Sequence, residues 1–270
     1  QSGGITRQRE VQGDARRCAE ESAVALDALL SHAPICPCRH RVEWGAGVMA
    51  IALVQSTSVL AAASATTIAL AFASNVTNGN FIVIAVNWQN TGISVSTVAD
   101  GTNTYSSITA AAINNVIFTQ IWYTWNITNG GTAPTITVTF SAAAVNRSLS
   151  IHEYSGVQTS ADPKDKNAQT NNQTVNSNAA DFATTGSVLP ATDGQLIFGA
   201  SKIHTSATGL SYNAGTNFTE RTEVQQGGGY PFETESFVQA TAASLAATWT
   251  VVGTTGPSTQ AQHVMATFKA

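Results

Sequence analysis

The residues best suited to chemistry form the short aromatic segment WYTW. In an extended strand Tyr123 and Trp125 share one face, while Trp122 points to the opposite face. With the amides of Gln120 and Asn126 beside it, the pair predicts a platform on which a sugar ring stacks while the amides bind its hydroxyls. The alternative is that both faces are buried, one in the core and one under a loop or a neighbouring subunit, because large aromatic side chains dominate core burial.

Three carboxylates form a second candidate set around a glycine-rich segment, QQGGGYP. Glu223 precedes this segment, and Glu233 and Glu235 follow it. A hairpin here would bring carboxylates together across strands, and a pair about 5–10 Å apart hydrolyses glycosides. Sequence spacing does not set that separation, so no catalytic residue is assigned. The chain also lacks the G-x-S-x-G elbow of serine hydrolases.

The residues His152 and Glu153 resemble the start of the zinc-binding motif H-E-x-x-H. Position 156 is glycine, however, and the context is a strand instead of a helix, so that motif is absent. Since His152 and Glu153 alternate along a strand, they face opposite ways. We expect Glu153 to be a strand carboxylate that accepts hydrogen bonds from turn amides.

Two other groups of possible metal ligands are too sparse to predict a site. Calcium needs six to eight oxygen ligands, and the aspartates of two loops cannot supply them. Zinc favours paired C-x2-C spacings, whereas the cysteines here are separated by a single proline. We therefore predict no metal and no other cofactor. The residues considered are Asp100, Asp162, Asp165, His32, Cys36, Cys38 and His40.

Residues 1–48 differ in composition from the rest of the chain. They contain all three cysteines and six of the twelve Lys and Arg residues, whereas the following part is rich in Thr, Ser, Asn, Ala and Val. Asp14 is placed to cap a helix that runs to about Leu30. We interpret residues 1–48 as a helical or disordered leader outside the fold, an upstream extension of the reading frame or an expression scar, with the natural protein starting at Met49.

Charge and hydropathy exclude two classes of partner. The chain has a formal net charge of −4 and no basic cluster after Arg41, whereas nucleic-acid binding needs a footprint of Lys and Arg. No run reaches the roughly 18 apolar residues of a membrane span. Charged residues make up only 10% of the chain, against about 25% in typical soluble domains, so Thr, Ser, Asn and Gln must supply the polar surface.

Alternating and continuous apolar runs predict an all-β fold after Met49. Residues 66–74 alternate between apolar and polar, and residues 81–88 are apolar on both faces, as in a central covered strand. Short strands between Gly, Asn, Ser and Pro turns are typical of a two-sheet antiparallel sandwich of the jelly-roll type. No repeat of constant period is visible, which disfavours propellers and solenoids. The length after Met49 fits one all-β sandwich, so we expect a single domain over residues 49–270. Further strands are expected at 115–126, 134–140, 147–154, 195–200, 217–224, 233–241, 246–252 and 260–268.

Several of these segments together resemble a known group of proteins. The segments are GNFIVIAVNW, VADGTNTY, IHEYSG, QLIFGA and MATFK, and the resemblance covers nearly all of residues 51–270. They are similar to a loose group of uncharacterised, jelly-roll-like β-sandwich modules from extracellular bacterial proteins. The resemblance implies the fold and an extracellular location, and it implies no chemistry.

Three functions follow as expectations, in order. The first is a non-enzymatic extracellular β-sandwich, a binding or surface-structural module whose most concrete form binds a glycan through Tyr123, Trp125, Asn126 and Gln120. The second is a virion decoration or fibre protein, and the third is a glycan-active hydrolase that uses the glutamates. Expected partners are a polysaccharide or a surface or capsid lattice, and self-association is open if the first strand, residues 51–57, adds to a neighbour's sheet edge.

Overall fold

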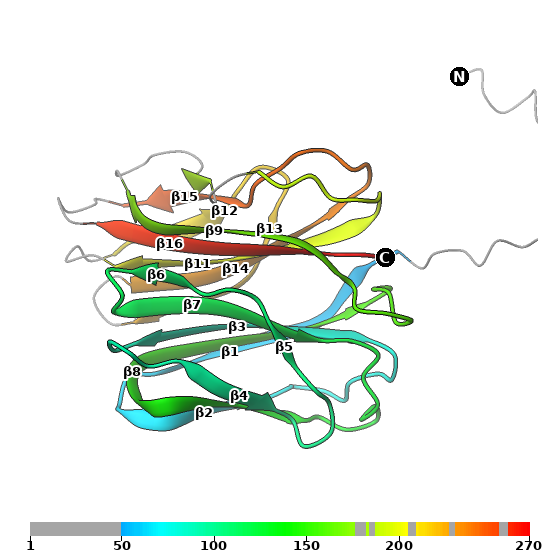
Figure 1. Ribbon diagram of the computed structural model, residues 1–270, viewed down its shortest axis with the longest axis horizontal. Coiled ribbons are helices and arrows are strands. Elements are labelled where there is room, and N and C mark those ends of the chain that lie inside the picture. The colour runs from blue at the N-terminus through cyan, green and yellow to red at the C-terminus, as the bar shows by residue number, and fades with distance from the viewer. Residues whose placement is uncertain (1–49, 176–181, 184–186, 205–208, 227–229, 254–258) are drawn as a thin grey trace, which may run out of the picture. The chain divides into compact units, whose positions relative to one another are not determined.

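All secondary structure in the described part of the chain is β-strand, and every strand pairing is antiparallel. This confirms the predicted all-β sandwich. The predicted leader lies outside the described residues. The computed structural model describes residues 50–175, 182–183, 187–204, 209–226, 230–253 and 259–270 (Figure 1).

The first half of the domain forms an inner sheet, sheet A, and a smaller outer sheet, sheet B. Sheet B consists of β2 (Ala65–Ala71) and β4 (Val95–Ala99) on either side of the N-terminal part of β8. Sheet A has the order β1-β8-β3-β7, with two short strands at the far edge of β7. Its strands are β1 (Ala52–Ala61), β8 (Thr135–Ser155), β3 (Phe81–Gln89), β7 (Ile117–Thr124), β5 (Ser106–Ser107) and β6 (Ala111–Ile113).

The second half repeats this plan. Sheet D, the outer sheet, has the order β10 (Phe182–Ala183), β15 (Thr248–Val252) and β12 (Ser211–Ala214). Sheet C, the inner sheet, has the order β9-β16-β11-β14-β13. The polar segment of residues 164–174 forms the edge strand β9. The strands of sheet C are β9 (Lys164–Thr174), β16 (Gln260–Phe268), β11 (Gln195–His204), β14 (Tyr230–Gln239) and β13 (Thr219–Gln226).

Strand β8 joins two strands that the sequence predicts as separate. Its first part pairs with β2 and β4 in sheet B, and its second part pairs with β1 and β3 in sheet A. Between the two parts Asn146 has a φ of 51°, a left-handed conformation that Asn tolerates better than most residues. The buried guanidinium of Arg147 then donates to the carbonyls of Ala63 and Thr67, which ties the β1–β2 turn to this crossing.

Three apolar clusters separate the sheets, which stack in the order B, A, C, D (Figure 1). Strand β3 shows why its sequence is apolar on both faces. Phe81 and Val83 pack toward sheet C, whereas Ile82 and Ile84 pack toward sheet B. A strand covered on both sides can expose no polar face, so its run of apolar residues is continuous.

The two halves are structural repeats. Their inner sheets have matching strand orders, β1-β8-β3-β7 and β9-β16-β11-β14, and each outer sheet has a central strand that leads into the inner sheet. In each repeat the first strand of the inner sheet also contacts the far edge of the other inner sheet. Ser56 Oγ on β1 donates to the Arg221 carbonyl on β13, and Asn171 on β9 accepts from the Ala112 amide on β6. The repeat therefore lies in the order of the strands, not in a constant period of the sequence.

Loops of unequal length hide the repeat in the sequence. The clearest traces are the segments DGTN and AGTN, which follow β4 and close β12, and ITV and TWTV in the outer strands. At equivalent core positions the two repeats divide the side-chain volume differently between the paired residues. Ile84 and Ile136 belong to one apolar cluster in the first repeat, and in the second repeat the equivalent residues are Gly199 and Trp249. A β-carbon on Gly199 would lie only 3.1 Å from the Trp249 ring, so the large indole requires the glycine.

Candidate functional site

A polar cavity lies between the two repeats, where β3 and β11 end. Its volume is about 160 Å³, and both inner sheets contribute to its wall. Positions that are equivalent in the two repeats meet here: Asn87 corresponds to Lys202, and Gln89 corresponds to His204. The lining residues are Asn87, Gln89, Ile117, Asn146, Lys202, His204 and Tyr230.

Hydrogen bonds fix the polar side chains of the wall. Asn87 is buried, and its Nδ2 donates to the Phe118 carbonyl over 2.7 Å. Half-buried Asn146 donates from Nδ2 to Gln89 Oε1 over 2.6 Å. The amides of the first repeat therefore hold one another and their own strands in place before any ligand arrives.

The second repeat contributes a buried amine to the same cavity. Lys202 is 2% exposed, and its Nζ donates to the Tyr230 carbonyl over 2.7 Å and lies 6.0 Å from the centroid of that ring. Burial lowers the pKa of Lys202 to about 7. The pKa of His204 is lowered as well, first by burial and then by the nearby charge of Lys202. Because the charged amine is poorly solvated here, this part of the cavity favours an anionic group.

Tyr123, one of the predicted platform residues, belongs to the core. It is 2% exposed and packs between sheets A and C, and its hydroxyl donates to the Asp162 carboxylate over 3.0 Å. Burial, followed by the charge of Asp162, raises its pKa. The half-buried Trp125 ring stacks on the Tyr123 ring with centroids 6.0 Å apart. Of this pair, only Trp125 retains appreciable surface.

The predicted amides are not gathered around these rings. Gln120 lies on the opposite face of β7, where its Nε2 donates to the Ile108 carbonyl and its Oε1 accepts from Trp122 Nε1. Asn126 is exposed just beyond the end of β7, with a φ of 50°. The structure thus brings Tyr123 and Trp125 together and places Gln120 with Trp122, as strand alternation requires.

The glutamates do converge, on the face of sheet C that is turned toward sheet D. Glu223 is the cross-strand partner of Glu233, and Glu220 is the partner of Glu235. The Gly215 amide donates to Glu235 Oε2 over 2.9 Å. Burial, then the charges of Glu235, Glu220 and Glu223, raises the pKa of Glu233 to about 10.

This geometry keeps the glutamates away from a large substrate. Glu233 and Glu235 are both fully buried, at 0% exposure. Glu223 is half-buried, and its pKa is raised chiefly by burial. A carboxylic acid held neutral is a reasonable general acid, but a glycosidic bond cannot reach one enclosed beneath a second sheet.

His152 and Glu153 occupy opposite faces of β8, as expected. His152 is fully buried, with Nε2 2.9 Å from Thr234 Oγ1, and burial lowers its pKa to about 3. Glu153 accepts from the Thr77 amide over 2.8 Å and from the Asn80 side chain over 2.6 Å. The expectation of a strand carboxylate bound by turn amides is confirmed.

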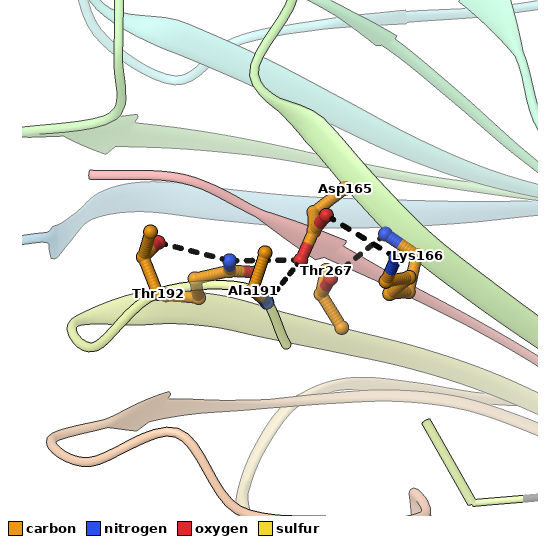
Figure 2. Close-up of polar contacts among 6 residues, drawn as sticks. Asp165, Lys166, Ala191, Thr192 and Thr267 are labelled. Atoms are coloured by element: carbon orange, nitrogen blue, oxygen red, sulfur yellow. Dashed lines mark hydrogen bonds and ion pairs between the residues drawn. The ribbon is translucent and has the colours of Figure 1, made fainter. Parts of the chain in front are cut away.

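The loop aspartates are also engaged by the protein itself. Asp100 accepts from the Thr102 and Asn103 amides and from the Tyr105 hydroxyl. Asp165 accepts from the Ala191 amide over 2.6 Å and pairs with Lys166, as Figure 2 shows. It also accepts from Gln195 Nε2 over 2.9 Å. Among the described residues, no group of three or more His, Cys, Asp or Glu side chains is arranged to hold a metal.

No protein family, curated protein or solved structure matches this chain. Among the residues described, no helix has the length and apolar character needed to cross a membrane. The function is therefore inferred from the geometry of the site.

The residues of the cavity are missed by reasoning from motifs, although a signal for them exists. In β3 and in β11 a continuous apolar run ends in alternating polar residues, Asn87 and Gln89 in one and Lys202 and His204 in the other. Polar groups at the covered end of a central strand need partners, so they mark a place where two sheets enclose polar space.

Proposed function

We propose that this chain is a non-catalytic glycan-binding module that acts outside the cell or on a particle surface, and that the cavity between the repeats holds the sugar. The observation that carries the proposal is that equivalent positions of two repeats converge on this cavity with different polar side chains. The first repeat supplies the amides of Asn87 and Gln89, and the second supplies Lys202 and His204. If the polar residues at the ends of β3 and β11 served only to stabilise the fold, we would expect similar side chains at the equivalent positions of the two repeats.

The chemistry of the wall suits a sugar. Amide oxygens and nitrogens bind hydroxyl groups in both directions, and the Asn146 and Gln89 pair offers such groups at the half-buried rim. The rings of His204 and Tyr230, whose centroids are 5.5 Å apart, form an aromatic side to the rim. Drug-sized ligands occupy pockets of about 300–1,000 Å³. This smaller cavity fits one sugar residue or one substituent of a longer chain.

Other features support a binding role over a catalytic one. The paired glutamates are buried beneath sheet D, and the loop aspartates are saturated with internal hydrogen bonds. The low charge of the chain, 10% of its residues, is in keeping with a surface made of hydroxyls and amides. The same surface suits a secreted protein and a protein exposed on a particle.

A glycan array with the full chain tests this proposal, followed by calorimetry on the sugars retained. Gln89→Ala should weaken binding about tenfold, because losing one or two hydrogen bonds to a sugar costs roughly 1.4 kcal/mol. Gln158→Ala is the matched control, since the Gln158 side chain is half-buried, donates a long 3.4 Å bond to the Ala161 carbonyl and lies in a different cavity. Equal loss in both variants, or no sugar retained by the full chain, would contradict the proposal.

A further inference from the structure

The side chain of Lys202 lies among apolar and neutral neighbours. It follows Phe198 and Ala200 on the face of β11 that packs against sheet A, and it is almost fully buried. From sheet A the groups that face it in the cavity are Asn87, Gln89, Ile117 and Asn146, and none of these is charged. From sheet C the titratable groups are His204 and Tyr230.

The amine is incompletely satisfied by these neighbours. An ammonium group has three hydrogens to donate, and the hydrogen bond from Lys202 goes to the Tyr230 carbonyl. Within the described ranges no Asp or Glu forms an ion pair with Lys202, whereas Lys166 does pair with Asp165 at 3.8 Å. A buried charge without a counterion is costly, so a group that supplies one is bound favourably.

Comparison of the repeats shows that the fold does not require an amine at this position. Asn87 is the equivalent residue of the first repeat, and its amide is bound by the Phe118 carbonyl and by Thr119 Oγ1. A neutral side chain paired within its own sheet therefore satisfies the same strand position. In the second repeat Phe232 occupies the position of Thr119, and its side chain has no oxygen that could accept a hydrogen bond from Lys202.

Resting on the proposed function, we propose that the sugar bound in this cavity carries an anionic oxygen group, a carboxylate or a sulfate, and that Lys202 Nζ binds it. The Tyr230 carbonyl fixes the direction of the amine, and the amides of Asn146 and Gln89 lie on the other side of the cavity for the hydroxyls of the ring. The subsite takes one anion, because one amine provides the charge.

Calorimetry with the full chain tests this subsite on three probes of matched length. These are an oligogalacturonate, a sulfated galacto-oligosaccharide and the neutral galacto-oligosaccharide. We expect the carboxylated or the sulfated probe to bind at least about tenfold more tightly than the neutral one, and the stronger of the two identifies the anion. Since the pKa of Lys202 is about 7, this preference should fall as the pH is raised from 6 to 9 and the amine loses its proton.

Lys202→Met tests the residue, because methionine has a similar length and no charge. The variant should lose the preference for the anionic probe while it still binds the neutral one. Lys166→Met is the matched control and should keep the preference, since Lys166 lies outside the cavity. If the neutral probe binds as tightly as the anionic ones, or if Lys202→Met keeps the preference, this inference fails and the glycan-binding proposal stands. If no probe binds, both fail.

Discussion

At the scale of single residues, the buried glutamates of this protein have two kinds of hydrogen-bond environment. Glu153 is surrounded by donors, from the Thr77 amide to the side chains of Gln55 and Asn80. Among the described residues neither oxygen of Glu233 has a hydrogen-bond partner, and three other carboxylates lie near it. The arrangement around Glu233 stabilises the protonated acid, and the pKa of this group is raised accordingly.

The pH dependence of stability should therefore carry a signature of Glu233. An unfolded glutamate releases its proton near pH 4.3, whereas folded Glu233 holds its proton up to about pH 10. Above pH 4.3 the unfolded chain gains by losing that proton, so stability falls as the pH rises toward 10. Glu233→Gln removes this pH-dependent contribution, so at pH 9 the variant should melt several degrees above the unaltered protein. The difference in melting temperature should be smaller at pH 5. A change of 1 kcal/mol in the free energy of unfolding corresponds to about 2–4 °C in a domain of this size.

Scanning calorimetry from pH 5 to pH 9 measures this effect. Glu153→Gln is the matched control, because it replaces one of two acceptor oxygens, in a side chain surrounded by donors, with an NH2 group. This variant should be less stable than the unaltered protein at every pH from 5 to 9. Parallel pH profiles for Glu233→Gln and the unaltered protein would contradict the prediction.

At the scale of elements, alternation along β7 divides its aromatic side chains between two cores. Tyr123 faces sheet C with Trp125 stacked on it, whereas Trp122 packs against the cluster between sheets A and B. Because one strand serves two cores, adjacent aromatic residues have different structural roles. The platform predicted from the sequence thus retains Trp125 as its partly accessible ring.

Substitutions on β7 should follow this division. Tyr123→Ala empties a site in the core and should cost about 3–5 kcal/mol, which lowers the melting temperature by roughly 6–20 °C. Trp125→Ala should cost clearly less, because that side chain is only partly buried. Thermal melts of the two variants test the order, and a larger loss for Trp125→Ala than for Tyr123→Ala would show that the assignment of faces is wrong.

At the scale of the whole domain, the two repeats bury their inner sheets against each other. Each repeat has an outer cluster of its own, whereas the central cluster draws on both, for example through Phe81 of the first repeat and Phe268 of the second, whose rings lie 4.7 Å apart. A repeat on its own would leave a broad apolar sheet face in water, which soluble proteins avoid.

The repeats should therefore depend on each other. Residues 50–157 and 158–270, produced separately, should fail to give a cooperative melt, and the two fragments produced together should associate and recover the β-rich circular dichroism of the intact domain. Affinity purification through a tag on one fragment measures the association. A separate fragment that melts cooperatively as a monomer would show that the central cluster is dispensable.

The sequence by itself determined the class of fold and where most of the strands lie. The reason is local, because alternation or continuity of apolar residues reports how many faces of a strand are covered, and both β2 and β3 follow that rule. It also determined the opposite faces of His152 and Glu153 and of Trp122 and Tyr123. These features depend only on the two-residue period of an extended chain.

The tertiary structure decided which separate segments meet. The union of β8 across Asn146, the cross-strand pairing of Glu223 with Glu233 and the meeting of Asn87 with Lys202 all join residues through long-range pairing. Loops of different length hide the repeat from any search for a constant period. The candidate site lies at the junction of the two repeats, so it exists only once both halves have folded against each other.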